Sequence, residues 1–295
     1  MTTPDSPSTL DSRFIVPLDM LFLRGNQLFG APGSYGESLM PPWPSVAAGA
    51  IRSRILADAG IDLAAFGEGL QPHPELGTPT QPGSFVLQAF HVARQQGNKL
   101  EMLLSEGTRS AEDGKLFTNR AVALKKDVGF VAAVAGAQLP DGGLLRLGGD
   151  GRAASIGPAD MAWPQPDYER IAREARCRIV LTSPGLFTQG WLPNGFTAAD
   201  SSYRFDLHGV QGRLVAASVA RSEVVSGWNL AGNQGKGSPK PAQRIAPTGS
   251  VYWLDELHAS PDALRKFAAA GLWGEPCEDV RRRAEGFNRF SLALY

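Results

Sequence analysis

The sequence predicts an α+β protein built from two similar halves. At 295 residues the chain is long enough for two domains of the usual roughly 100 to 200 residues, each with its own core. Strand-like apolar runs alternate with a few segments that carry helix start and stop signals. Two stretches, 13–22 and 178–187, share an arginine, an apolar run, a polar or proline break and a Leu-Phe ending. This weak repeat suggests a pseudo-duplication in which each half opens with the same strand.

The first half is predicted to open with a core strand and then a helix. Residues 13–25 form a β-rich apolar run that ends on a basic residue and a glycine. Pro44 at a first helical position, good helix formers after it and Gly60 as a stop predict a helix of about four turns. Its apolar face, expected to pack against a sheet, consists of Ala47, Ile51 and Ile55.

A second face of this helix is small and basic. Ser45, Gly49 and Arg52 share it, close to the helix N-terminus. Helix N-termini present free N–H groups and a positive dipole end, so this face is suited to a phosphate. Close helix packing at Gly49 beside a solvated Arg52 explains the same pattern, and the sequence leaves both interpretations open.

The remainder of the first half is predicted to be mostly strand and loop. Residues 60–83 are punctuated by prolines and form a connecting excursion, and 85–92 follow as a strand. Residues 104–125 are polar with alternating charge, which predicts an exposed hairpin or loop before a core strand over 128–139.

The second half begins after a plausible linker at 162–167. We therefore expect a disordered tail over 1–12, a first domain over 13–165 and a second domain over 166–295. Helices are expected over 168–176 and from Ser260 to about Ala270, the latter with Pro261 at its first position. Strands are expected over 178–187, 213–221, 250–254 and 286–295. Arg281, Arg282 and Arg283 lie on a short helix, as a solvated face or an RNA contact.

Composition excludes several classes of function. The net charge is zero and the pI is about 6.9, so no global field draws the chain to nucleic acid, and any such site must be local or shared with partners. Two cysteines without a Cys-x-x-Cys pair give no disulfide framework and no metal site, and point to a reducing cytoplasm. The first dozen residues lack the features of a signal peptide, and the most apolar run is too short to span a membrane.

A basic, glycine-rich stretch stands out at 226–254, SGWNLAGNQGKGSPKPAQRIAPTGSVYWL. It holds no acid and three cations, Lys236, Lys240 and Arg244. Backbone with few Cβ atoms approaches a ligand closely, and positive charge beside it favours a phosphate backbone. An idle surface loop is the alternative on these residues alone.

Two nucleotide-binding motifs are nearly matched and fail. A phosphate-binding loop of the Walker type needs Gly-Lys-Ser/Thr, whereas Gly235 and Lys236 are followed by Gly237. The run Gly149-x-Gly151-x-x-Ala154 matches a dinucleotide fingerprint, but Gly-Pro at 157–158 prevents the helix that the fingerprint requires. A glycine turn between two strands is expected there, and no cofactor.

Several segments in this order resemble subunit three of the type III-B (Cmr) CRISPR effector complexes, a RAMP-superfamily protein. They are PLDMLFLRG, MPPWPSVAAGAIRSRIL, TRSAEDGKLFT, LRLGGDGR, LTSPGLFTQGWLP, and VSGWNLAGNQGKG leading to RIAPTGSVYWL. The resemblance implies two ferredoxin-like (RRM-like) domains that face each other, with loop and hairpin insertions. It also implies a subunit without catalytic activity that holds the 5′ handle of the CRISPR RNA. Its partners would be the large polymerase-like subunit and the first backbone RAMP subunit, with no membrane involved.

The resemblance assigns roles to particular residues. The glycine-rich loop, 226–250, would cradle RNA, and the small face of the first helix would line the same cleft. The residues expected to bind RNA are Ser45, Gly49, Arg52, Gly227, Trp228, Gly235, Lys236, Gly237, Lys240 and Arg244. Those expected to contact RNA or a neighbouring subunit are Arg24, Arg109, Lys115, Arg120, Lys125 and Lys126.

Two other classes of function remain open at this point. A metal-independent CRISPR-RNA-processing endonuclease needs a general base near a 2′-hydroxyl and a cation on the phosphate. The four histidines, His73, His91, His208 and His258, have no neighbouring partner at useful spacing. A purely structural interaction protein without RNA contacts is supported by the neutral net charge.

Overall fold

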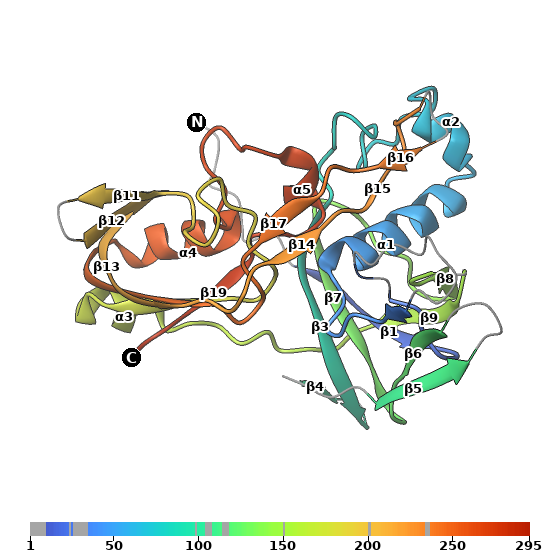
Figure 1. Ribbon diagram of the computed structural model, residues 1–295, viewed down its shortest axis with the longest axis horizontal. Coiled ribbons are helices and arrows are strands. Elements are labelled where there is room, and N and C mark those ends of the chain that lie inside the picture. Colours follow the sequence, from blue (N-terminus) through green and yellow to red (C-terminus); the bar gives the residue numbers. More distant parts are fainter. Residues whose placement is uncertain are drawn as a thin grey trace. The chain divides into compact units, whose positions relative to one another are not determined.

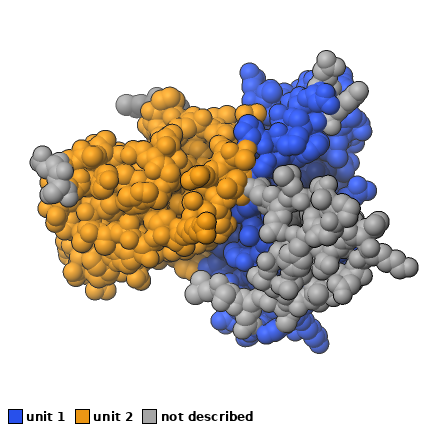
Figure 2. All heavy atoms as spheres, viewed as in Figure 1, with its two compact units in different colours: residues 1–162, 226–241, 284–286 blue, residues 163–225, 242–283, 287–295 orange. Residues whose placement is uncertain are grey.

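The computed structural model describes residues 10–23, 25, 35–97, 99–103, 108–113, 118–149, 151–199, 202–233 and 237–295 (Figure 1), with the backbone alone for 35–37, 108–113 and 118–120. The chain divides into two compact units (Figure 2). Unit 1 comprises 1–162, 226–241 and 284–286, and unit 2 comprises 163–225, 242–283 and 287–295. The glycine-rich loop is thus divided between the units after residue 241.

Unit 1 is built on a six-stranded antiparallel sheet in the order β4-β3-β7-β1-β9-β8. Its strands are β1 (Asp11–Pro17), β3 (Val86–Gln96), β4 (Lys99–Met102), β7 (Val128–Ala135), β8 (Leu144–Arg146) and β9 (Ala153–Pro158). Helix α1 (Pro44–Asp58) packs on it, and its Ala47, Ile51 and Ile55 lie in the core with Ile15 and Phe130. The expected helix and its apolar face are confirmed.

Smaller elements extend unit 1. Helix α2 (Leu63–Gly67) lies inside the predicted excursion, where Asp62 caps it by accepting hydrogen bonds from the N–H groups of Ala64 and Ala65. The expected hairpin is present as β5 (Thr108–Asp113) and β6 (Thr118–Ala123), and β6 also pairs with β2 (Tyr35–Glu37).

Unit 2 has its own six-stranded antiparallel sheet, in the order β11-β12-β13-β18-β10-β19. Its strands are β10 (Cys177–Leu181), β11 (Phe196–Ala199), β12 (Ser202–Leu207), β13 (Val210–Ser218), β18 (Val251–His258) and β19 (Phe290–Ala293). Helices α3 (Tyr168–Glu174) and α4 (Pro261–Ala270) pack against each other, and α5 (Val280–Ala284) precedes the last strand. Ser260 caps α4 by accepting from the N–H of Ala263, as its start signal predicted.

In both sheets the first strand of the unit lies between two later strands. In unit 1 the first strand, β1, lies between β7 and β9, and in unit 2 β10 lies between β18 and β19. The alignment of residues 13–22 with 178–187 does not hold residue by residue. Arg13 is buried and lies on the same face of its strand as Ile15, whereas Arg178 is exposed and lies on the face opposite to the buried Ile179. Since side chains alternate along a strand, the two arginines are out of step by one residue.

The α+β class is confirmed by these two antiparallel sheets and their helices. A βαββαβ unit needs a helix after its first strand and another after its third. In the described residues, unit 1 has no helix between β7 and β9, and unit 2 has none between β10 and β13. The ferredoxin-like description of each half, and the expectation that the halves face each other, therefore stay predictions.

Two separate two-stranded sheets lie in and beside the glycine-rich loop, whose unit 1 part, residues 226–241, we call the arm. In unit 2, β14 (Glu223–Val225) pairs with β17 (Gln243–Ile245), and in unit 1, β15 (Trp228–Asn229) pairs with β16 (Ser238–Pro239). Strands this short have no readable hydrophobic period, so the sequence could only indicate a loop. No helix in the described part of the chain is long and apolar enough to cross a membrane.

Candidate nucleic-acid interface

The tryptophan of the arm lies against the glycine that directly precedes the opposite strand, β16. Trp228 of β15 is paired with Pro239, and its side chain is 56% exposed. A Cβ atom added to Gly237 would lie 2.2 Å from the indole Nε1 of Trp228, so only glycine allows the ring to lie this close. Gly237 also has a φ of +82°, which side chains disfavour. One part of the indole is therefore held by backbone while much of the ring stays open to solvent.

Replacing Gly237 with alanine is expected to displace the Trp228 ring and to lower the free energy of unfolding by about 2 kcal/mol, of which the left-handed backbone accounts for about 1. The indole N–H resonance of Trp228, identified from its loss in Trp228→Phe, should shift. Gly249→Ala is the matched control, because its φ of +86° gives the same backbone cost and no atom lies within 4 Å of the added Cβ. An unchanged indole N–H resonance in Gly237→Ala would contradict the close contact between the Trp228 ring and Gly237.

Lys240 is engaged by a carboxylate. Its backbone N–H donates to the carbonyl of Gly227 (2.9 Å), and its carbonyl accepts from the Ser226 hydroxyl (2.7 Å). Its Nζ forms an ion pair with Glu285, and the two side chains are only 14% and 10% exposed. Lys240 thus ties the arm to residues 284–286, which belong to the same unit.

Arg52 lies near the same carboxylate. Its guanidinium stacks over the Phe85 ring at 4.7 Å from the centroid. Its Nε is buried and has no hydrogen-bond partner in the part of the chain that the structure describes. Burial lowers the pKa of the guanidinium, and the negative charge of Glu285 raises it in part. A desolvated guanidinium with an unused donor is disposed to bind an anion.

The small face of α1 is open. Gly49 is exposed, and no described atom lies within 4 Å of the position that its Cβ would take. Close helix packing at Gly49, one of the two interpretations left by the sequence, is therefore not found among the described residues. On this face, Gly49 is exposed and Ser45 and Arg52 are half-buried.

The other residues expected to contact RNA lie in several places. Arg244 is exposed on β17 of unit 2, and Gly227 has a φ of +129° at the base of the unit 1 arm. Lys125 and Lys126 are exposed in the turn before β7. Arg109 and Arg120 lie on β5 and β6, where only the backbone is described. Arg24, Lys115, Gly235 and Lys236 lie outside the described residues.

The arginine run on α5 is not uniform. Arg281 and Arg283 are exposed, whereas Arg282 is only 2% exposed, stacks on Phe287 and donates from Nε to Gln243 (3.0 Å). Arg282 therefore has a packing role in unit 2.

The sequence missed Glu285 as the partner of Lys240, because the two are 45 positions apart and no local pattern joins them.

Two of the four histidines, His73 and His208, make hydrogen bonds that fix their position in the fold. The Nδ1 of His73 accepts from the N–H groups of Glu75 and Leu76. His208 bonds the carboxylate of Glu275 through Nδ1 (3.0 Å) and the carbonyl of Trp273 through Nε2 (2.8 Å). Burial lowers the pKa of His91. Across the described residues, no cluster of histidine, cysteine and carboxylate side chains is able to hold a metal ion.

Comparison with known proteins identifies the family. No curated protein sequence matches the chain. Among solved structures, a chain of the type III-B Cmr-beta bound to cognate target RNA and AMPPnP, seen by cryo-EM, is 14% identical with a TM-score of 0.49; the match covers 96% of this chain and 98% of that one. A chain of the type III-B Cmr-beta bound to cognate target RNA is also 14% identical, with a TM-score of 0.47 and the same coverage.

The family model described as CRISPR-associated protein (Cas_Cmr3) matches residues 13–106 and 98–292. These matches together span nearly all of the chain, and they confirm the resemblance carried by its ordered segments. The chain belongs to the CRISPR-associated protein (Cas_Cmr3) family.

Proposed function

We propose that this protein is a non-catalytic RNA-binding subunit of the type III-B CRISPR effector complex, acting in the cytoplasm in antiviral defence. It anchors the 5′ handle of the CRISPR RNA and bridges the large polymerase-like subunit to the backbone RAMP subunits. Family membership supports a subunit of that complex. The observation that carries the RNA-anchoring role is the Arg52 guanidinium, which is stacked and partly desolvated and whose Nε donor meets no partner among the described residues.

The surroundings of Arg52 suit a nucleic-acid backbone. Gly49 is exposed beside half-buried Ser45, and the missing side chain at Gly49 lets a phosphate approach α1 closely. The arm in the same unit adds the solvent-facing indole of Trp228, on which an unpaired base can stack. Because the net charge is zero, partner subunits supply part of the electrostatic attraction.

Arg52→Gln is expected to weaken binding of handle RNA by the assembled complex about tenfold and to reduce the salt slope by about one unit. Affinity would be measured by fluorescence anisotropy over a salt series. Arg54→Gln is the matched control on the same helix, because Arg54 is paired with Asp58 (2.7 Å) and also donates to the carbonyl of Leu144 (2.5 Å). Equal salt slopes of RNA affinity in the Arg52 and Arg54 variants would show that Arg52 does not contact the RNA.

The non-catalytic part of the proposal has a separate test. Purified protein incubated with repeat RNA in the absence of metal is expected to leave the RNA intact. Clean cleavage that disappears in a histidine-to-alanine variant would establish the processing endonuclease instead.

A further inference from the structure

Two cations of unit 1 share one carboxylate, that of Glu285. The Nζ of Lys240 forms an ion pair with it, and both side chains are largely buried. Arg52 lies near enough for the charge of Glu285 to act on its guanidinium, whose Nε meets no hydrogen-bond partner in the described part of the chain. Arginine and lysine bind carboxylates and phosphates through the same donors. A phosphate that enters this site therefore competes with the carboxylate of Glu285.

The carboxylate is held in place by the backbone that follows it. Gly286 has a φ of +88°, and a Cβ atom added to it would lie 2.9 Å from the carbonyl oxygen of Leu87 on β3. The Arg52 guanidinium stacks on Phe85, two residues before Leu87. Glu285 is thus tethered beside the two cations within one unit. A tethered group competes at an effective concentration in roughly the millimolar range or above.

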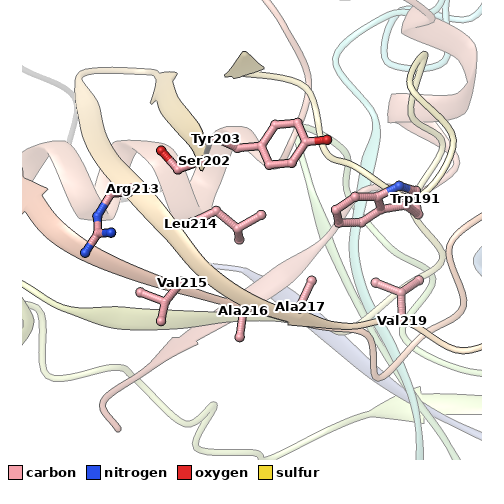
Figure 3. A pocket seen from close by; sticks show the side chains of 9 residues that line it. All are labelled: Trp191, Ser202, Tyr203, Arg213, Leu214, Val215, Ala216, Ala217 and Val219. Carbon is pink, nitrogen blue, oxygen red and sulfur yellow. The ribbon is translucent and has the colours of Figure 1, made fainter. Parts of the chain in front are cut away.

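The carboxylate does not neutralise both cations, so one positive charge is left for a ligand with several phosphates. The pocket of unit 2 has the opposite balance (Figure 3). Arg213 is the one cation among the described residues that line it. Its Nε and Nη2 donate to the two carboxylate oxygens of Asp255 (3.1 and 2.6 Å), and Nε also lies 3.0 Å from Glu256. Two carboxylates compensate Arg213, whereas one carboxylate serves both cations of unit 1.

We infer that Glu285 is a built-in competitor at the site of Arg52 and Lys240 and determines which anions bind there. Its carboxylate takes the place of a phosphate, so a free phosphate or nucleotide, which binds through few contacts, does not displace it. A nucleic-acid backbone makes further contacts, at the open Gly49 of α1 and at the indole of Trp228, and displaces it. The inference rests on the proposed function in one respect, that the displacing ligand is RNA.

The test measures phosphate binding at Arg52 in the full chain without RNA. Inorganic phosphate is titrated at constant ionic strength while NMR follows the Nε–H resonance of Arg52, which is assigned by its loss in Arg52→Gln. In Glu285→Gln we expect saturation with a Kd of about 1 mM, at least about tenfold tighter than in the wild type. In the assembled complex, about 10 mM phosphate should then weaken handle-RNA binding by up to about tenfold in Glu285→Gln and by less than about twofold in the wild type.

Asp58→Asn is the matched control. It also removes one carboxylate from unit 1, and that carboxylate pairs with Arg54 (2.7 Å) at the end of α1. A general electrostatic effect would tighten phosphate binding equally in both variants, which would overturn the inference. If Glu285→Gln does not fold, Glu285→Asp keeps the charge but shortens the side chain, and it should bind phosphate more tightly than the wild type. An unchanged affinity in Glu285→Asp would also overturn the inference.

The two proposals fail in different ways. If phosphate binds equally to the wild type and to Glu285→Gln, then Glu285 only anchors the arm. Handle-RNA binding by the wild-type complex would still support the proposed function in that case. If Glu285→Gln gains the phosphate site but the wild-type complex does not bind handle RNA, the proposed function fails, and with it the assignment of RNA as the ligand that displaces Glu285.

Discussion

Asn288→Ala is expected to lower the free energy of unfolding by about 4 kcal/mol. Asn288 is completely buried in unit 2. Its Oδ1 accepts from the N–H of Leu186 (2.5 Å), and its Nδ2 donates to the carbonyls of Leu186 (3.1 Å) and Leu272 (3.2 Å). Alanine leaves the N–H and the carbonyl of Leu186 without their side-chain partner, at a cost of about 1–3 kcal/mol each, whereas the carbonyl of Leu272 still accepts from Nδ2 of Asn194 (3.3 Å). Urea titration followed by circular dichroism measures the change.

A second contribution comes from the backbone at this position. Asn288 has a φ of +60°, which asparagine tolerates and which costs alanine about 1 kcal/mol. Asn288→Gly is the matched variant, because it removes the same three hydrogen bonds without that backbone cost. We expect glycine to be about 1 kcal/mol less damaging than alanine. If the free energies of unfolding of both variants lie within about 1 kcal/mol of the wild type, the hydrogen bonds of Asn288 to Leu186 and Leu272 do not stabilise unit 2 as expected.

The elements that could be predicted are those whose information is local. The apolar residues of α1 recur with the helical period, and Ala47, Ile51 and Ile55 are at most 7% exposed. The start of α4 needed only Ser260 and the proline after it. Capping and amphipathic spacing depend on residues within a few positions, so a single sequence is enough to read them.

The site could be predicted only in part, because its important contacts are long-range. Arg52 was chosen for its place on α1, but its environment is set by the distant Phe85, over which its guanidinium stacks, and by the charge of Glu285. Lys240 was chosen for its charge, and the carboxylate that pairs with it comes from the far end of the chain. Arg282 belongs to a run of like charges that usually marks a solvated face, yet it is buried. The surroundings of Arg52, Lys240 and Arg282 are set by tertiary packing, which local charge patterns do not reveal.

The ion pair between Lys240 and Glu285 should control the stability of the arm. Lys240→Met and Glu285→Leu are each expected to lower the free energy of unfolding by about 3 kcal/mol, because each strands one charge in a largely buried position. The double variant should recover most of the loss, since two apolar side chains replace the pair. Urea unfolding gives the coupling energy, and limited proteolysis reports whether the arm has detached. A double variant as unstable as either single variant would show that the pair is not coupled.

The same double variant decides what Lys240 does for RNA. If Lys240 also reaches a phosphate when RNA is bound, as its position in the arm predicts, then the stable double variant binds handle RNA more weakly than the wild type. Its salt slope falls by about one unit, the release expected for one lost phosphate contact. If the double variant has wild-type stability and an unchanged salt slope of RNA affinity, Lys240 anchors the arm and does not contact RNA. Among the described side chains, Arg52 and the indole of Trp228 would then be the unit 1 contacts with the strongest structural support, and their joint loss should weaken handle binding further than either loss alone.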